Sequence, residues 1–260
     1  MSAGGVAVVV QARTGSRRLP DKVLLPLAGE PALLRMLQRV ERIEDADERV
    51  VATSEAPGDD AIAELCRRHG VRCARGSEDD VLARTVAALP PGCDTVVRLT
   101  GDCPLVEPAL VDLHLRRFAE EQPFAGYVTN TVVRSWPDGM DVEVVDRELL
   151  ERAAREARTR YDREHVTPWV RRRARTVPVA QEVDLSALRL TLDTRSDYEA
   201  IAGIWDALGP GAGFVLRDVY ALLLRRPDLL RVQGRERLDD SEREAWLGRL
   251  RCQLAAGEAA

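Results

Sequence analysis

The chain has 260 residues, which is long enough for one large α/β domain with its own buried core. Hydrophobic residues make up 45% of the sequence and charged residues 31%, as is ordinary for a globular protein in water. The formal net charge of −5 argues against non-specific nucleic-acid binding, which needs a basic surface. We therefore expect no nucleic-acid partner, and any site for an anion must be local.

The cysteines and the first residues indicate the compartment. Five cysteines are present, an odd number, and none of them forms a C-x-x-C pair. This usage is typical of reduced thiols in a cytoplasm rather than of a disulfide framework or a zinc site. The N-terminus lacks the pattern of a signal peptide, and no apolar run reaches the length of a transmembrane helix. We expect a cytoplasmic protein with no membrane partner.

The first predicted element is a buried parallel strand over the apolar run from Val6 to Val10. It leads into a loop whose basic side chains are Arg13, Arg17, Arg18 and Lys22. Ligands of open α/β sheets bind outside the carboxyl ends of the strands, so this loop is placed to meet an anion. Because no glycine-rich dinucleotide or phosphate-loop motif is present, these side chains would supply the positive field for a phosphate. The alternative is a solvated basic loop.

Strands and helices alternate through the first half of the chain. In order, the pattern predicts a helix from Pro31, a strand at 49–53, a helix from about Asp59 to Gly70, a strand from Gly70, a helix after the capping box Ser77-x-x-Asp80, a strand at 95–99 and a helix from Pro108. Such alternation calls for a mostly parallel sheet covered by helices on both faces. The predicted fold class is α/β.

The alternation of strands and helices stops at Tyr127. Residues 127–146 predict irregular strands around the turn Trp136-Pro137-Asp138-Gly139, and so a small β excursion. Large apolar side chains in this stretch are too many for a surface left in water, which indicates an interface or a ligand groove. They are Tyr127, Val132, Val133, Trp136 and Met140.

The second half of the chain predicts mostly helices. The expected elements are helices at about 147–158 and 162–173, strands near 175–180 and 188–193, a helix after the capping box Thr194-x-x-Asp197, and helices at about 216–225 and 239–254. We expect one domain over 1–232 and a helical C-terminal extension over 233–260.

Two acidic residues are expected at the carboxyl ends of strands. Asp102 follows one predicted strand and Asp193 ends another, so their carboxylates can converge on one crevice. Magnesium prefers a few carboxylates together with phosphate oxygens and waters, which makes this pair suitable for a metal–triphosphate complex. The alternatives are a turn-forming role for Asp102 and a helix-entry role for Asp193.

Five motifs lie in order between about residues 5 and 232. They are Gln11-Ala12-Arg13-x-x-Ser16-x-Arg18-Leu19-Pro20-x-Lys22, Arg98-Leu99-Thr100-Gly101-Asp102-Cys103-Pro104-Leu105, Trp136-Pro137-Asp138-Gly139-Met140-Asp141-Val142-Glu143-Val144, Arg163-Glu164-His165-Val166-Thr167-Pro168 and Leu190-Thr191-Leu192-Asp193-Thr194-Arg195-Ser196-Asp197-Tyr198. Together they resemble the sugar cytidylyltransferases, which make CMP-activated 3-deoxy-octulosonate and sialic-type acids, and among them the spore-coat polysaccharide biosynthesis branch. The resemblance implies a Rossmann-like nucleotide-diphospho-sugar transferase domain, CTP and a sugar as substrates, Mg²⁺ as cofactor, and a homodimer in which residues 127–146 help complete the sugar site.

The resemblance also implies roles for individual residues. The expected catalytic residues are Arg13, Lys22 and Asp102, and the expected metal ligands are Asp102 and Asp193. The expected nucleotide contacts are Ala12, Arg13, Ser16, Arg18, Lys22, Thr53, Arg75 and Ser77. The expected sugar contacts are Asp141, Glu143 and His165, with exposed strand carboxylates as the alternative for the two acids. The run Arg75-Gly76-Ser77 differs from the octulosonate enzymes, so CTP preference rests on the family likeness.

The predicted function is transfer of CMP from CTP to an acidic sugar, with release of pyrophosphate, for the synthesis of surface polysaccharide or glycoconjugate. One alternative is a glycosyltransferase that consumes nucleotide sugars on a similar fold. Such enzymes usually hold their metal with an Asp-x-Asp after a strand, and the tripeptide here, Asp45-Ala46-Asp47, lies in a turn before a strand. The other alternative is a nucleotide-binding module that has lost turnover.

Overall fold

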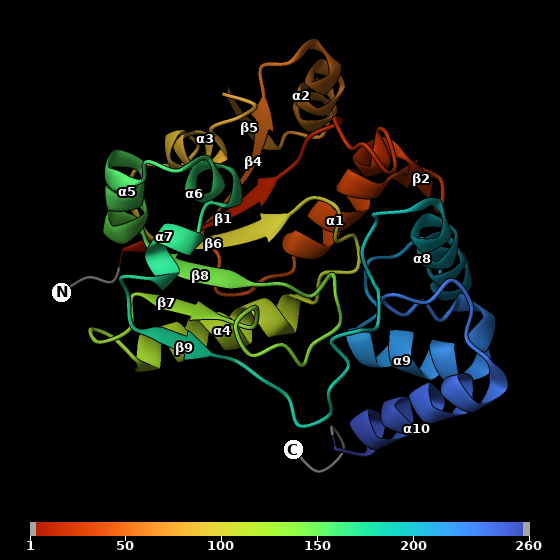
Figure 1. The fold of residues 1–260 in the computed structure, drawn as a ribbon. Coiled ribbons are helices and arrows are strands. Elements are labelled where there is room, and N and C mark those ends of the chain that lie inside the picture. The colour runs from red at the N-terminus through yellow and green to blue at the C-terminus, as the bar shows by residue number, and fades with distance from the viewer. Residues whose placement is uncertain (1–3, 257–260) are drawn as a thin grey trace.

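The fold is built on one mixed β-sheet (Figure 1). Within residues 4–256, which the computed structural model describes, this sheet has seven strands. Their order across the sheet is β5 (Arg72–Gly76), β4 (Glu48–Ser54), β1 (Gly5–Gln11), β6 (Cys93–Thr100), β8 (Glu143–Asp146), β7 (Tyr127–Thr129) and β9 (Thr176–Pro178). The strands from β5 to β6 are parallel, and β8 is antiparallel to both of its neighbours. The predicted α/β fold with a mostly parallel sheet is therefore confirmed.

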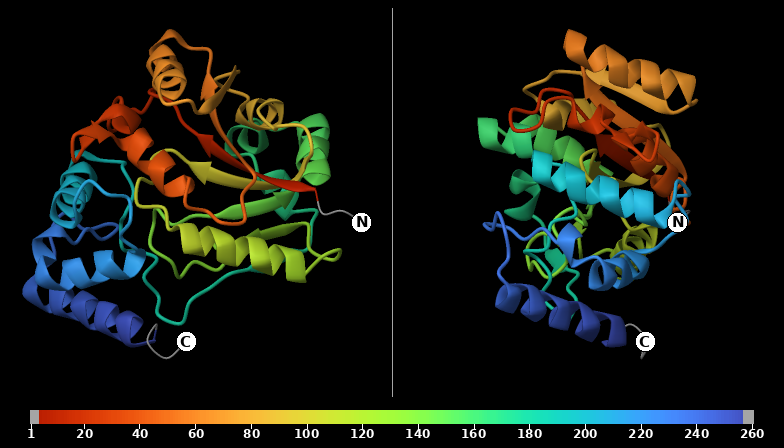
Figure 2. Two further views of the ribbon diagram at one scale, coloured as in Figure 1. Left: turned by 180° about the vertical axis from the view of Figure 1, so that it is seen from behind. Right: turned by 90° about the vertical axis from the view of Figure 1, so that its right-hand side faces the viewer.

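Helices cover both faces of this sheet because the central strands are apolar on both faces. One layer consists of α1 (Ala32–Val40), α2 (Asp60–Arg68) and α4 (Pro108–Glu120). The other consists of α3 (Val81–Ala87), α5 (Arg147–Glu156), α6 (Arg160–His165) and α7 (Pro168–Arg171). Along β1, Val8 and Val10 face the first layer while Ala7 and Val9 face the second, as the two-residue period of a strand requires. Figure 2 shows α1 and α4 in front of the sheet in the view from behind.

A third group of helices packs beyond the carboxyl ends of β1 and β6. It consists of α8 (Arg195–Leu208), α9 (Leu216–Arg225) and α10 (Asp240–Ala256), which lie on the side towards which the β1 and β6 arrows point in Figure 1. Trp246 and Leu250 of α10 join the same apolar core as α1 and α4. The short elements are η1 (Lys22–Leu24), β2 (Pro26–Leu27), β3 (Glu30–Pro31), η2 (Pro57–Asp59) and η3 (Pro227–Leu229). None of the helices found in residues 4–256 has both the length and the apolar character needed to cross a membrane.

Residues 127–146 differ from the prediction of a separate excursion. They begin and end with β7 and β8, which are strands of the central sheet, and only the loop between them leaves it. The reason is that both strands are apolar on both faces: Val128 and Val144 belong to one core and Tyr127 and Val145 to the other. Such a pattern is typical of strands buried between two helical layers.

The large apolar side chains of residues 127–146 are mostly buried within their own chain. Tyr127 and Met140 have no exposed surface, and Trp136 packs against the core of its own chain with its Nε1 donating to the Val179 carbonyl at 3.1 Å. Val133, at 51% exposure, is the clearly exposed large side chain among the five named. Most of these side chains fill the interior of their own chain, so their number does not by itself indicate an interface or a ligand groove.

The expected strand at 188–193 is also wrong in kind. Leu188, Leu190 and Leu192 are buried as their alternation predicts, but their backbone bonds go to different segments rather than to one strand. Leu190 N–H donates to the Asp138 carbonyl at 2.7 Å, and Leu192 N–H donates to the Asp102 carbonyl at 2.8 Å. This stretch is thus an extended strap that crosses the carboxyl edge of the sheet and leads into α8.

Two smaller boundaries also moved. The helix expected over 162–173 is divided into α6 and α7 by Val166, whose φ is 71°, and by Pro168. Helix α3 is capped by the Asp80 side chain, which accepts from Ala83 N–H, so Ser77 is not the cap residue. By contrast, the capping box of Thr194 and Asp197 forms as predicted at the start of α8.

Candidate active site

The basic loop after β1 is held by a buried carboxylate. Thr14 donates from its backbone N–H and its hydroxyl to Asp59 Oδ1, at 2.7 and 2.8 Å. Ser54, at the end of β4, donates from its N–H and hydroxyl to Asp59 Oδ2 at 3.2 and 2.5 Å. Burial alone would raise the pKa of Asp59, but these hydrogen bonds hold it below the usual value. Asp59 therefore ties the loop to the neighbouring strand, a role that its sequence position at a helix start does not reveal.

The loop also lies close against the end of β6. Gly101 N–H donates to the Gln11 carbonyl at 2.8 Å, and Ala12 N–H donates to the Ala52 carbonyl at 3.2 Å. A Cβ on Gly101 would lie 2.9 Å from the Ala12 Cβ, closer than carbon atoms can pack. Glycine at this position thus brings the Asp102 turn next to the basic loop.

Lys22 joins the two acidic residues that the sequence placed at this edge. Its Nζ lies 2.6 Å from Asp102 Oδ2 and 2.9 Å from Asp193 Oδ1. Asp102 comes from the turn after β6 and Asp193 from the strap before α8, so three distant segments meet at one ammonium group. The Lys22 side chain is 12% exposed, and the two carboxylates are 25% and 20% exposed. The structure brings Asp102 and Asp193 together, as predicted, and places the Lys22 ammonium between them.

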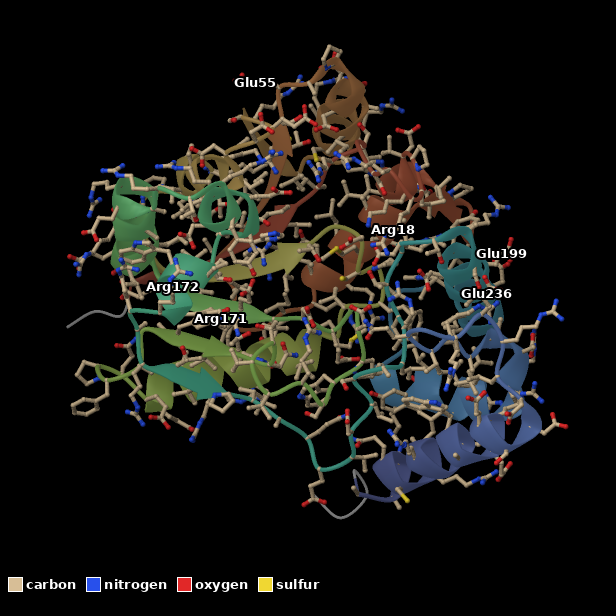
Figure 3. All side chains as sticks on the ribbon, viewed as in Figure 1. Arg18, Glu55, Arg171, Arg172, Glu199 and Glu236 are labelled. Carbon is tan, nitrogen blue, oxygen red and sulfur yellow. The ribbon has the colours of Figure 1, made fainter. Side chains whose placement is uncertain are left out.

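Two arginines hold the other oxygen of Asp193. Arg18 Nη2 lies 3.0 Å from Asp193 Oδ2, and Arg189 Nη2 lies 3.2 Å from the same atom. Figure 3 shows Arg18, which belongs to the basic loop, near the start of α8. Burial acts to raise the pKa of Asp193, but the hydrogen bond from Lys22 and the charges of Lys22 and Arg18 keep it below the usual value.

Arg189 was not predicted as a site residue. Besides Asp193, it contacts Asp138 at 2.9 Å and Asp197 at 2.8 Å, and its side chain is 14% exposed. A signal was present in the sequence, since 189 and 193 lie on the same side of an extended segment whose leucines face the core. Arg189 therefore links the strap, the turn at Asp138 and the start of α8.

The remaining predicted nucleotide contacts differ in accessibility. Arg13 is exposed and has no hydrogen-bond or ion-pair partner among the described residues, and Ser16 Oγ accepts from Leu19 N–H at 3.3 Å. Arg75 donates to the carbonyls of Ser54 and Ala56, at 2.9 and 3.2 Å.

The other two predicted nucleotide contacts differ sharply in exposure. Ser77 is exposed, and its Oγ accepts from Asp80 N–H at 3.0 Å. Thr53 has no exposed surface, so its side chain lies below the edge of the sheet and is not positioned to touch a ligand.

The Glu143 side chain is buried and bonded within the protein, rather than free to contact a sugar. It is 4% exposed, and it accepts hydrogen bonds from Tyr127 and from Thr167 Oγ1, the latter at 2.6 Å, and pairs with Arg98. Burial acts to raise its pKa, but the charge of Arg98 and these hydrogen bonds keep it low. The prediction that Glu143 itself contacts sugar does not fit this geometry, because its oxygens are already occupied.

Thr167 connects Glu143 to a strained turn that presents His165. Thr167 N–H donates to the His165 carbonyl at 2.8 Å across Val166, whose φ of 71° is rare for a β-branched residue. The His165 side chain is exposed, with its ring centroid 4.5 Å from that of Tyr161. Asp141, the other predicted sugar contact, pairs with Arg134 at 3.0 Å, and burial raises its pKa.

The Asp-x-Asp tripeptide lies at the opposite edge of the sheet. Asp47 Oδ2 accepts from Val6 N–H at 2.7 Å, at the start of β1, and Asp45 N–H donates to Asp112 at 3.1 Å. These carboxylates are therefore remote from the carboxyl ends of the strands. The position of Asp45 and Asp47 gives no support to a glycosyltransferase metal site.

The residues fit a divalent cation that arrives with a phosphate ligand. No group of three or more His, Cys, Asp or Glu side chains in the described part of the chain is arranged to hold a metal by itself. Asp102 and Asp193, however, each direct one oxygen at a single cation, the Lys22 ammonium. Magnesium is commonly held by one or two carboxylates and completed by substrate phosphates and waters.

The comparison with known proteins agrees with the geometry of this edge. Residues 7–202 match the model of the family described as cytidylyltransferase. The chain belongs to the cytidylyltransferase family. It is accordingly a CTP-dependent nucleotidyltransferase, and the resemblance stated from its motifs is confirmed.

Individual relatives are similar to this chain over most of its length. The chain is 33% identical over 236 residues to the spore coat polysaccharide biosynthesis protein SpsF of Bacillus subtilis, and the matched region covers 86% of this chain and 95% of SpsF. A solved cytidylyltransferase from Leptospira borgpetersenii superposes with a TM-score of 0.84 at 32% identity, covering 91% of this chain and all of that one. The CMP:2-keto-3-deoxy-manno-octonic acid synthetase solved with CTP shares the fold, with a TM-score of 0.58 at 16% identity over 79% of this chain and all of that one.

Proposed function

We propose that the protein transfers CMP from CTP to an acidic sugar and releases pyrophosphate, in the synthesis of surface polysaccharide or glycoconjugate. The observation that carries this proposal is the meeting of Lys22, Asp102 and Asp193 beside the basic loop, at the carboxyl edge of the sheet. Family membership supports CTP as the nucleotide. The names of SpsF and of the octulosonate enzymes support a sugar acceptor for a cell-surface product.

The basic loop would bind the triphosphate. Arg13 and Arg18 have exposed guanidinium groups, which can each donate two hydrogen bonds to phosphate oxygens. Ser16 offers a hydroxyl, and Ala12 offers close backbone approach without a large side chain. Arg75 and Ser77 lie after β5, where cytosine and ribose would follow from the triphosphate along the edge of the sheet.

Asp102 and Asp193 would hold Mg²⁺, which when bound neutralises charge on the α-phosphate. An oxygen of the acceptor sugar attacks the α-phosphorus, a new O–P bond forms, and the bond to the pyrophosphate oxygen breaks; where the attacking oxygen is a hydroxyl, its proton passes to solvent. Lys22 and Arg13 stabilise the negative charge that grows on the departing pyrophosphate. The chain supplies position and charge in this scheme, and no covalent protein intermediate is required.

The acceptor sugar would lie between the turn at His165 and the loop that contains Asp141. His165 is exposed, and Asp141 is held by a single arginine, so both can exchange partners with sugar hydroxyls. Glu143 supports this site from below through Thr167 and Tyr127. We therefore assign Glu143 a positioning role and leave direct sugar contact to the other two.

Three further features belong to the same proposal. We infer a cytoplasmic location, consistent with five free cysteines, and a C-terminal extension over 233–260 on a transferase domain over 1–232. We also infer a two-fold homodimer, supported by the family resemblance and by the exposed Val133 in the loop between β7 and β8. Light scattering at assay concentration tests the dimer, and a monomer with full activity would contradict it.

The experiment that tests the function is a panel assay of pyrophosphate release. The protein is incubated with Mg²⁺, each of the four nucleoside triphosphates and a set of acidic sugars and sugar phosphates. We expect release with CTP and one acidic sugar, well above the blank without sugar. A protein that binds CTP but releases no pyrophosphate with any acceptor would favour the inactive nucleotide-binding module.

A further inference from the structure

The sequence uses lysine once. Of its 38 lysine and arginine residues, the single lysine is Lys22. Arginine presents a planar fork of donors, whereas lysine presents a compact point charge on a flexible four-carbon stem. A chain so rich in arginine therefore has its one compact organic cation at the centre of the candidate active site.

The Lys22 ammonium lies where a small cation would lie. One oxygen of Asp102 and one of Asp193 approach it at 2.6 and 2.9 Å, and its side chain is 12% exposed. The second oxygen of Asp193 is taken by Arg18 and Arg189, and the second oxygen of Asp102 lies 3.6 Å from Cys103 Sγ. The two carboxylate oxygens that face each other thus share one positive charge.

The backbone of Lys22 is anchored independently of the two ion pairs that its side chain makes. The next residue, Val23, is 2% exposed and packs in the main core, and Leu24 N–H donates to the Asp21 carbonyl at 2.7 Å. The ammonium can therefore move by rotation about the side-chain bonds while η1 stays in place. The basic loop, with Arg13 and Arg18 exposed, lies beside it, where we have placed the triphosphate.

We propose that Lys22 is a displaceable stand-in for the divalent cation, so that the metal site is closed in the free protein and opens when a nucleoside triphosphate draws Lys22 away. The ammonium and a divalent ion compete for the same two oxygens, because both need the same negative charge. Phosphate oxygens give Lys22 another anionic partner and complete the metal coordination. Binding of metal and binding of nucleotide then favour each other, and this coupling must be reciprocal. The proposal rests on the proposed function for the identity of the nucleotide.

The test measures metal binding rather than turnover. Affinity for Mn²⁺ is determined by electron paramagnetic resonance for the wild type and for Lys22→Met, with and without a non-hydrolysable CTP analogue. In the wild type we expect the analogue to tighten Mn²⁺ binding by about tenfold or more. Without nucleotide, Lys22→Met should bind Mn²⁺ about tenfold more tightly than the wild type, because the competing charge is gone.

Arg17→Met is the matched control. Arg17 lies in the same loop, is exposed, and has no hydrogen-bond or ion-pair partner in the part of the chain that the structure describes. It removes the same charge from the same loop without freeing either carboxylate, so its Mn²⁺ affinity without nucleotide should stay near the wild-type value. Equal Mn²⁺ affinity in the wild type and Lys22→Met would overturn the proposal.

A second measurement follows the lysine directly and needs no variant. Because the chain has one lysine, protein labelled with [¹³C,¹⁵N]-lysine gives a single lysine side-chain signal in an NMR spectrum. We expect that signal to move when Mg²⁺ and the CTP analogue are added together, and to move little with Mg²⁺ alone at the same concentration. A full shift with Mg²⁺ alone would show that the ion needs no nucleotide, and so would refute the coupling. If the proposed transfer of CMP to an acidic sugar failed in the panel assay, the comparison of Lys22→Met with the wild type in the absence of nucleotide would still decide the stand-in role.

Discussion

Removal of the Arg189 guanidinium should destabilise the fold at the candidate site. Arg189 donates from Nε and Nη2 to the two oxygens of Asp197, at 2.8 and 2.9 Å, and the Asp197 side chain is 3% exposed. Loss of one partner from a buried pair of this kind costs about 3–5 kcal/mol. Asp197 keeps its bonds from Thr194 N–H and Oγ1, both at 2.9 Å, so we expect Arg189→Met to lose about 3 kcal/mol of unfolding free energy.

The pH dependence of this loss is a sharper test. Burial acts to raise the pKa of Asp197, but the hydrogen bonds from Arg189 and Thr194 hold it below the usual value. A carboxyl with a lowered pKa in the fold stabilises the protein above its unfolded pKa, about 4, and loses that contribution as the pH falls through the folded value. The gap between wild type and Arg189→Met should therefore narrow below about pH 4.

The assay is urea denaturation at several pH values. Arg195→Met is the control, because Arg195 pairs with Glu199 on the surface of the same helix with 70% of its side chain exposed. That variant should lose no more than about 0.5 kcal/mol. If Arg189→Met also stayed within about 0.5 kcal/mol of the wild type at pH 7, the assignment of Arg189 as the link between strap, turn and helix would be refuted.

Two further predictions concern buried groups. In Glu143→Gln, the KM for the sugar should rise roughly tenfold while the KM for CTP stays unchanged, because the turn at His165 loses its support. Steady-state kinetics in which both KM values stay unchanged would contradict the positioning role of Glu143. His114 is buried, which lowers its pKa to about 4. Since the unfolded histidine takes up a proton at higher pH, the wild type should lose about 3 kcal/mol between pH 7 and pH 4 relative to His114→Leu in denaturation experiments. Equal pH profiles would show that His114 takes up its proton at the same pH in the folded and unfolded states, which would contradict the lowered pKa.

The sequence carried enough information for the central strands and for one end of the site. The runs that form β1 and β6 are apolar on both faces, which is why they could be recognised as buried parallel strands. The turns after such strands mark the ligand edge, so the basic loop and Asp102 followed from position alone. The helices that begin at Ala32 and Pro108 were indicated by proline at or near the first turn.

The parts that could not be predicted depend on partners far apart in the chain. The alternating leucines at 188, 190 and 192 are buried as a strand would be, but only the structure shows that their backbone N–H groups donate to Leu185, Asp138 and Asp102, respectively. Asp59 accepts a hydrogen bond from Thr14, which lies 45 positions earlier, and no local sequence pattern predicts that contact. The sequence predicted Glu143 as a sugar contact, with an exposed strand carboxylate as the alternative. Neither interpretation includes its buried contacts, because its partners Arg98 and Thr167 lie 45 and 24 positions away in the chain.

The central claim is that Asp102 and Asp193, with Lys22, form the centre at which CTP reacts. The most direct test is the rate of pyrophosphate release from CTP by Asp102→Asn, measured over a Mg²⁺ titration with the acceptor sugar that the wild type uses. Asparagine keeps the shape of the side chain and removes its charge, so the rate should fall by about 10²–10³ while the protein stays folded. An unchanged rate with a normal dependence on Mg²⁺ would contradict the account.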